Sequence, residues 1–110
     1  MKTIIAAATA TALFTISGIA AAGPVELTKE FGGDCLACHA VDHKVVGPAW
    51  KDVAAKYKGN ASARDTLVEK VIKGGKGNWD KVTGGMVMTP HPSKPTKEQI
   101  GKIVDAILKL

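Results

Sequence analysis

The sequence predicts an all-α fold of about four short helices in one small domain. Apolar residues recur at intervals of three and four over residues 50–57, 62–73 and 96–108, which is the period of a helix with one buried face. No segment alternates apolar and polar residues in the way that a half-buried strand does. With 110 residues, 45% of them hydrophobic and 5% aromatic, the chain can form a single small core.

Residues 1–22 predict a secretory signal peptide, followed by one domain over residues 23–110. Lys2 is the only charge before an apolar run that ends at Ala22, and small alanines precede Gly23. A membrane-spanning helix is the alternative, but the run is rich in alanine and threonine rather than leucine, which favours removal of the segment. We therefore expect export to the periplasm.

A short amphipathic segment over residues 25–31 predicts the N-terminal helix. Its apolar residues are Val25, Leu27 and Phe31. The pair Gly32-Gly33 ends this helix, because paired glycines stop helices and allow a tight backbone turn.

The stretch Cys35-Leu36-Ala37-Cys38-His39 has the spacing that attaches a c-type haem. Two cysteines three positions apart can reach both vinyl groups from one helical turn, and the histidine that follows can ligate the iron. These are the only cysteines in the chain, so a disulfide framework is excluded. A redox-active dithiol is the main alternative. A zinc site lacks a second ligand pair, since only His43 and His91 remain.

Two helices are predicted between this motif and the glycine-rich middle of the chain. Pro48 suits the first turn of the first helix. The buried face of that helix comprises Trp50, Val53, Ala54 and Tyr57. The second helix begins at Ser62, which forms a capping-box pattern with Asp65, and it ends at Gly74-Gly75.

Residues 74–95 predict a long irregular loop. Five glycines and three prolines argue against a regular helix or strand there. A loop of this length in a small domain indicates a function, and we interpret it as the source of a second iron ligand. Its Gly-Gly-Lys-Gly run lacks the spacing of a phosphate-binding loop.

Residues 96–108 show the clearest helical pattern in the chain. Thr96 and Gln99 form a capping-box pattern at the start. The apolar stripe consists of Ile100, Ile103, Val104, Ile107 and Leu108. We expect this stripe to pack on the N-terminal helix near Phe31.

Together, several of these motifs resemble a small bacterial class I c-type cytochrome. The matching segments are Cys35-x-x-Cys38-His39, Val46-Gly47-Pro48-Ala49, residues 51–57, Ile72-Lys73-Gly74-Gly75, Gly77-x-Trp79, Met88-x-Pro90 and the terminal helix. The resemblance covers nearly all of the chain after the signal peptide. It implies the class I cytochrome c fold, wrapped around one covalently bound haem c and its iron.

The resemblance also implies a role for each matching residue. It implies that Cys35 and Cys38 form the haem thioethers and that His39 is the proximal iron ligand. The Pro48 carbonyl would accept a hydrogen bond from the other ring nitrogen of that histidine. Trp79 matches a tryptophan that contacts a haem propionate in relatives, with plain core packing as the alternative.

Met88 and Met86 are the two candidates for the sixth iron ligand. Met88 is our choice, because Pro90 follows it two residues later as in the ligand loop of the family, and Met86 is the alternative. Residues 80–85 look like an insertion relative to the shortest relatives. His91 stands near an asparagine that bonds the ligand sulfur in relatives, and ligation by His91 itself is a minor alternative.

These ligands predict an electron-transfer protein rather than an enzyme. Nitrogen and sulfur would fill both axial positions of the iron, which leaves no position for a substrate. The leading hypothesis is a one-electron carrier in a periplasmic respiratory chain. The alternatives are the cytochrome subunit of a periplasmic dehydrogenase complex, and a five-coordinate gas-binding or sensor cytochrome.

The positive charge of the chain indicates partners with acidic surfaces. The net charge is +5, and Lys44, Lys81 and Lys94 lie in segments that flank the predicted ligands. We predict that they steer the protein to acidic patches on redox donors and acceptors, with a generic solubilising surface as the alternative. The lysines are scattered among acidic residues, which argues against nucleic acid binding. We expect a monomer that meets membranes only through partner complexes.

Overall fold

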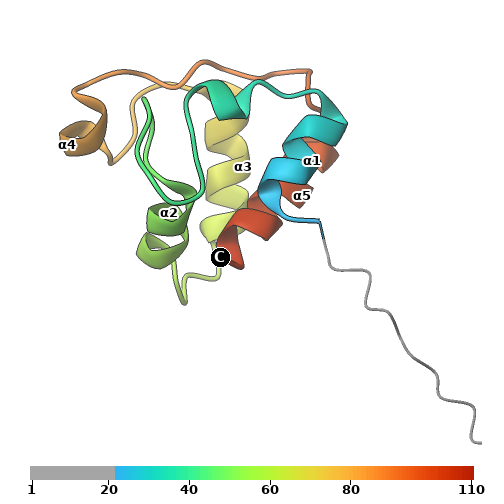
Figure 1. Cartoon of the computed structure of the whole chain (residues 1–110), viewed down its shortest axis with the longest axis horizontal. Helices are drawn as coiled ribbons and strands as arrows, with labels where there is room; N and C mark the ends of the chain where they lie inside the picture. The colour runs from blue at the N-terminus through green and yellow to red at the C-terminus, as the bar shows by residue number, and fades with distance from the viewer. Residues whose placement is uncertain (1–21) are drawn as a thin grey trace, which may run out of the picture.

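The computed structural model of the chain describes residues 22–110, and the predicted signal peptide lies outside this range apart from Ala22. The described part contains α1 (Pro24–Phe31), the 3-10 helix η1 (Cys35–Ala37), α2 (Trp50–Lys56), α3 (Ala63–Lys73), α4 (Asp80–Thr83) and α5 (Lys97–Leu108). Residues 22–110 form no strand, so the all-α prediction is confirmed (Figure 1). None of the helices in this range is long and apolar enough to cross a membrane.

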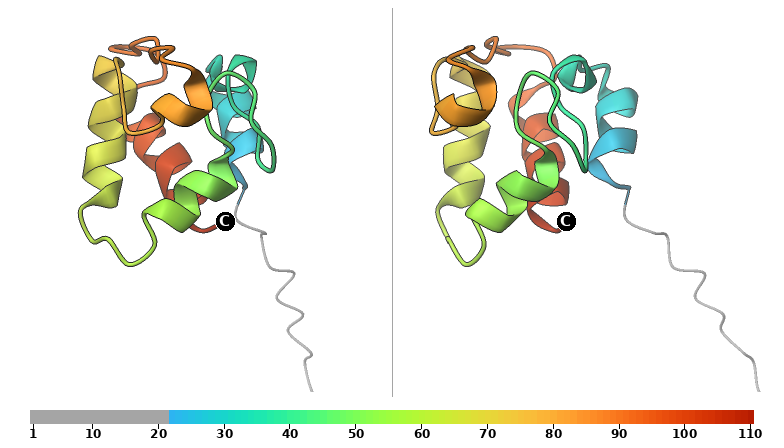
Figure 2. Two further views of the ribbon diagram at one scale, coloured as in Figure 1. Left: turned by 90° about the vertical axis from the view of Figure 1, so that its left-hand side faces the viewer. Right: turned by 60° about the vertical axis from the view of Figure 1, so that its left-hand side comes forward.

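Helix α5 is the centre of the fold. It packs against α1, α2 and α3, and Figure 2 shows it enclosed by these three helices. One edge of α5 contributes Ile103 and Ile107 to a core cluster with Trp50 of α2, and Phe31 of α1 packs against this cluster. The predicted contact between the terminal helices is therefore confirmed.

The other edge of α5 joins a second core cluster. Ile100 and Val104 pack there with Val68 of α3, and all three side chains are buried. Gly101 is also buried where α5 passes α3, and the Arg64 guanidinium lies over it. The Arg64 Nε atom donates to Asp105 Oδ1 at 2.8 Å, which ties the two helices together at their surface.

The two predicted capping boxes have different outcomes. Thr96 accepts a hydrogen bond from the Gln99 N–H, and the Gln99 side chain accepts one from the Thr96 N–H, so this capping box is present. Ser62 is the N-cap of α3, but its side chain caps nothing, and the prediction of a capping box with Asp65 is wrong. The side chain of Asn60 instead accepts from the Ser62 N–H at 2.9 Å, which forms a local turn.

Two further expectations are corrected. Pro48 does not lie in the first turn of α2, because the N-cap of that helix is Ala49. The segment 74–95 is not wholly irregular, because Asp80–Thr83 forms the single helical turn α4. This turn lies within the predicted insertion, and it ends at Gly84, which has φ +64°.

The segment that follows α4 runs along one end of the molecule, from α4 to the start of α5 (Figure 1). Its middle is held by an isolated bridge between Gly75 and Met88. The backbone N–H of each residue donates to the carbonyl of the other, with N to O distances of 2.8 and 3.1 Å. Further along, the His91 N–H donates to the carbonyls of Val71 and Ile72 at the end of α3. The chain after Met88 is thus fastened to α3.

Candidate haem-binding site

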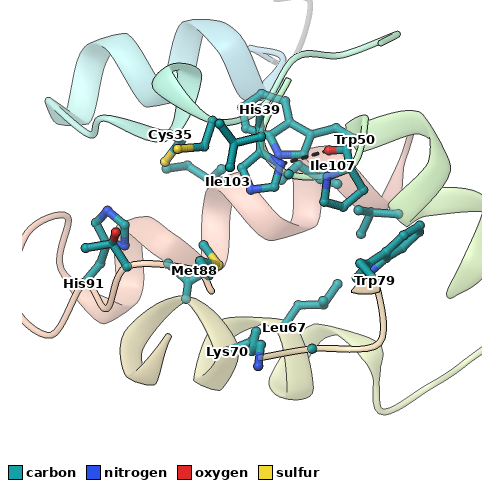
Figure 3. A pocket seen from close by; sticks show the side chains of 18 of the residues that line it. Cys35, His39, Trp50, Leu67, Lys70, Trp79, Met88, His91, Ile103 and Ile107 are labelled. Carbon is teal, nitrogen blue, oxygen red and sulfur yellow. Dashed lines mark hydrogen bonds between the residues drawn. The ribbon is translucent and has the colours of Figure 1, made fainter. Parts of the chain in front are cut away.

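A cavity of about 300 Å³ lies at the meeting point of the elements that carry the predicted site residues. Its walls come from η1, α2, α3, α5 and the segment 74–95, and they are mostly apolar. Leu67, Ile103 and Ile107 are among the lining side chains (Figure 3). Apolar walls of this kind suit a large planar apolar ring, whose burial they would stabilise.

The two cysteines stand on the rim of this cavity. The turn of η1 places them there, and backbone N–H groups of Cys38 and His39 both donate to the Cys35 carbonyl, at 3.2 and 2.9 Å. Cys35 is half-buried, and burial raises the pKa of its thiol. Cys38 is exposed. The two sulfurs are therefore placed to hold one group at the junction of cavity and solvent.

His39 presents its imidazole to the cavity in a fixed orientation. Its Nδ1 atom donates to the Pro48 carbonyl oxygen at 2.9 Å, and a carbonyl can only accept, so Nδ1 carries the proton. The Nε2 lone pair is then available to a metal. Burial lowers the pKa of His39, partly opposed by the Pro48 bond, and this favours the neutral ring.

Trp50 and Gly47 set the position of that ring. The Trp50 indole stacks on the imidazole with centroids 5.9 Å apart and planes 19° from parallel. A Cβ atom on Gly47 would lie only 2.5 Å from Cε1 of His39 and 2.9 Å from its Nδ1. Gly47 had no separate role in the sequence prediction, because its closeness to His39 follows from the loop fold and not from any spacing.

Met88 faces His39 across the cavity, with the thioether on the opposite wall (Figure 3). Met88 is half-buried, and the bridge with Gly75 holds its backbone on both sides. Met86 also lines the cavity, but its side chain is 60% exposed. Gly74 allows the methionine segment to pass close to the end of α3, because a Cβ atom at Gly74 would collide with the backbone of Met88 and Pro90.

Trp79 lies at the far end of the cavity from Cys35 (Figure 3). It also packs against the core cluster that contains Trp50 and Ile107, so Trp79 contributes to the core as well as to the cavity wall. The Lys56 ammonium stands 4.5 Å from its ring centroid and donates to the Asn78 carbonyl at 3.2 Å. These contacts hold Trp79 in place at the edge of the cavity.

The two remaining histidines have different environments. His43 is exposed, and its Nδ1 atom donates to Oδ1 of its neighbour Asp42 at 2.9 Å. His91 lines the cavity with a side chain that is 13% exposed, and its Nε2 atom lies 2.6 Å from Asp34 Oδ1. His43 is therefore a surface residue, whereas His91 belongs to the cavity wall, and no spacing in the sequence links it to Asp34.

Comparisons with known proteins agree with this geometry. A family model described as Cytochrome c matches residues 26–110. The chain is 42% identical over 97 residues to cytochrome c-551 of Allochromatium vinosum, which covers 88% of this chain and 98% of that protein. The crystal structure of wild-type Nitrosomonas europaea cytochrome c552 superimposes with a TM-score of 0.65 and 37% identity, over 78% of this chain and 98% of that one. The class 1 cytochrome MtoD from Sideroxydans lithotrophicus has a TM-score of 0.59 and 31% identity, over 78% and 90%.

The fold and the site thus define a haem protein of the class I c type. The chain belongs to the cytochrome c family, as a small bacterial class I c-type cytochrome. It carries one covalently bound haem c with its iron, and it serves in electron transport.

Proposed function

We propose that this protein is a periplasmic one-electron carrier whose haem is held by Cys35, Cys38, His39 and Met88. The observation that carries the proposal is the cavity itself, where the His39 imidazole and the Met88 thioether face one another and both cysteines stand on the rim. When bound, haem supplies a one-electron couple between ferric and ferrous iron.

His39 acts as the nitrogen ligand, and Pro48 fixes its tautomer. The bond from Nδ1 to the Pro48 carbonyl holds the ring so that Nε2 faces the cavity, and it increases the basicity of the ligand. Trp50 stacks on the ring and prevents it from turning. These two contacts would keep the nitrogen ligand in one orientation toward the haem iron.

Met88 acts as the sulfur ligand on the opposite wall. A thioether is a soft ligand that favours ferrous iron, and an apolar cavity disfavours the extra charge of ferric iron. Both effects raise the reduction potential. The backbone anchor at Gly75 and the partial burial of Met88 support this residue over Met86, whose side chain is 60% exposed.

Cys38 marks the solvent-exposed side of the site, since it is the exposed member of the cysteine pair. A redox partner would therefore approach the bound haem from this side. Met86 and Val87 are each 60% exposed on the cavity lip and offer an apolar contact for a redox partner. Lys44, Lys81 and Lys94 are exposed as well, and they would attract acidic partner surfaces.

Two features support export to the periplasm. Residues 1–22 have the composition of a secretory signal peptide. A reduced pair of cysteines outside the cytoplasm would oxidise unless it is consumed, and attachment of haem consumes it. A respiratory chain of the periplasm is the setting that suits such a carrier.

A spectroscopic redox titration of the purified holoprotein tests this function. We expect one reversible transition with a single electron, at a positive potential, and a ferrous form that does not bind carbon monoxide because His39 and Met88 would leave no open position on the iron. A ferrous form that binds carbon monoxide at once would instead support the five-coordinate sensor. Purification in a fixed ratio with an oxidoreductase would instead support the dehydrogenase subunit.

A further inference from the structure

His91 and Asp34 form a contact between two segments that are far apart in the sequence. Their side chains meet at 2.6 Å between Nε2 and Oδ1, and the residues are 57 positions apart. Asp34 directly precedes Cys35 and is the N-cap of η1. His91 lies three positions after Met88, so this contact joins the haem-attachment turn to the methionine segment.

His91 is fixed by its backbone as well as by its side chain. Its N–H donates to the carbonyls of Val71 at 2.9 Å and Ile72 at 3.2 Å. Its side chain is 13% exposed, whereas that of Asp34 is 75% exposed, so the pair sits at the lip of the cavity with the carboxylate outermost. Since the carboxylate accepts, Nε2 is the donor in this bond.

The other ring nitrogen of His91, Nδ1, lies inside the protein. It is buried and has no hydrogen-bond partner among residues 22–110. His91 and Asp34 both line the cavity. Burial of Nδ1 without a hydrogen-bond partner costs free energy, and the bond from Nε2 to Asp34 offsets part of that cost when the ring is in this position.

We propose that the Asp34–His91 pair is a latch that keeps the methionine segment closed over the haem, with His91 as the positioning residue for Met88. Met88 is itself held by its bridge to Gly75, and His91, three positions later, holds the segment on the other side of it. For the Met88 thioether to leave the iron, the segment must move away from the haem-attachment turn, and this motion breaks the latch. The inference rests on the proposed ligation by Met88.

The chain contains a matched control for this latch. Asp42 and His43 form a similar pair at 2.9 Å, but both side chains are exposed, by 71% and 68%, and the residues are neighbours in sequence. That pair joins no two segments. Its removal should therefore leave the methionine segment unaffected, although the chemical change is the same.

Two measurements on the ferric holoprotein test the latch. Hydrogen exchange of the Met88 amide, which is bonded to the Gly75 carbonyl, reports opening of the segment whatever the sixth ligand is. The rate of imidazole binding reports access to the iron. We expect Asp34→Ala and His91→Ala each to increase both rates by about threefold to tenfold, as for the loss of one partly exposed charged hydrogen bond.

The controls make the outcome specific. The double variant should be no faster than the single ones, because each removes the same bond. His91→Gln, which keeps a donor, should restore part of the effect, and Asp42→Ala should behave as wild type. Wild-type rates in both alanine variants, or additive effects, would overturn the latch. Faster amide exchange without faster imidazole binding would keep the latch and instead refute ligation by Met88.

Discussion

Gly47 allows His39 to lie against the backbone of its own loop. Because a Cβ atom at this position would lie 2.5 Å from the imidazole, Gly47→Ala must displace either the ring or the chain around Pro48. We expect the free energy of unfolding of the ferric holoprotein to fall by about 1–3 kcal/mol, which is typical of an overpacked site. Denaturation with urea measures this change.

Gly77→Ala is the matched control for this substitution. A Cβ atom on Gly77 would come within 3.3 Å of the end of the Lys70 side chain, which is flexible and can move, and its distance of 3.9 Å to Trp79 Cδ1 is an ordinary contact. Its stability should remain close to that of the wild type. Equal losses in the two variants would show that the closeness of Gly47 to His39 has no energetic effect.

Asp34 provides a prediction about pH. The hydrogen bond from His91 lowers the pKa of the Asp34 carboxyl below its ordinary value. The carboxylate therefore stabilises the folded state above the ordinary pKa, and this contribution is lost as the pH falls through the lowered value. NMR titration of Asp34 should give a lower midpoint in the wild type than in His91→Ala. Identical midpoints would contradict the bond.

Single residues also show what the sequence could and could not predict about the site. Cys35, Cys38 and His39 were recognisable because their chemistry depends on spacing within five residues. Pro48, nine positions after His39, could be paired with it only through the family resemblance. The bond between His91 and Asp34 spans 57 positions and depends on how two loops meet in space, so no local pattern encodes it.

At the scale of helices, local signals predicted α1, α2, α3 and α5 but not their details. The apolar residues that predicted α5 are buried or half-buried in the structure, where they contribute to both core clusters. The single turn α4 escaped prediction because four residues are too few to show a period. Ser62 shows that a capping-box pattern is not sufficient, since Asn60 takes over the local hydrogen bonding.

The two N-caps allow a direct test of this difference between helices. Thr96→Ala removes a side-chain cap that is present in α5, so we expect the free energy of unfolding to fall by about 1 kcal/mol. Ser62→Ala removes a side chain that caps nothing in α3 and should have a much smaller effect. Thermal denaturation of both variants measures the comparison, and an equal loss at both positions would refute it.

At the scale of the whole molecule, the distribution of lysines predicts how the protein meets its partners. The rate of oxidation of the ferrous protein by ferricyanide, a small anion, should fall as ionic strength rises, because salt screens the attraction. Charge reversal of Lys44, Lys81 and Lys94 together should lower the rate by about tenfold at low salt.

Lys109→Glu is the control for this prediction. Lys109 is exposed at the end of α5, near the C-terminus, and Figure 1 shows this end of the molecule away from the methionine segment. Its charge reversal should change the rate far less than reversal of the three loop lysines. A rate that does not depend on salt would leave the lysines as a solubilising surface only.

In the proposed site, His39 and Met88 together close the coordination of the iron. The most direct test is the ferric absorption spectrum of Met88→Ala beside that of Met86→Ala. A sulfur-to-iron charge-transfer band in the red should be present in the wild type, persist in Met86→Ala and vanish in Met88→Ala. A band that persists in Met88→Ala and vanishes in Met86→Ala would contradict this assignment.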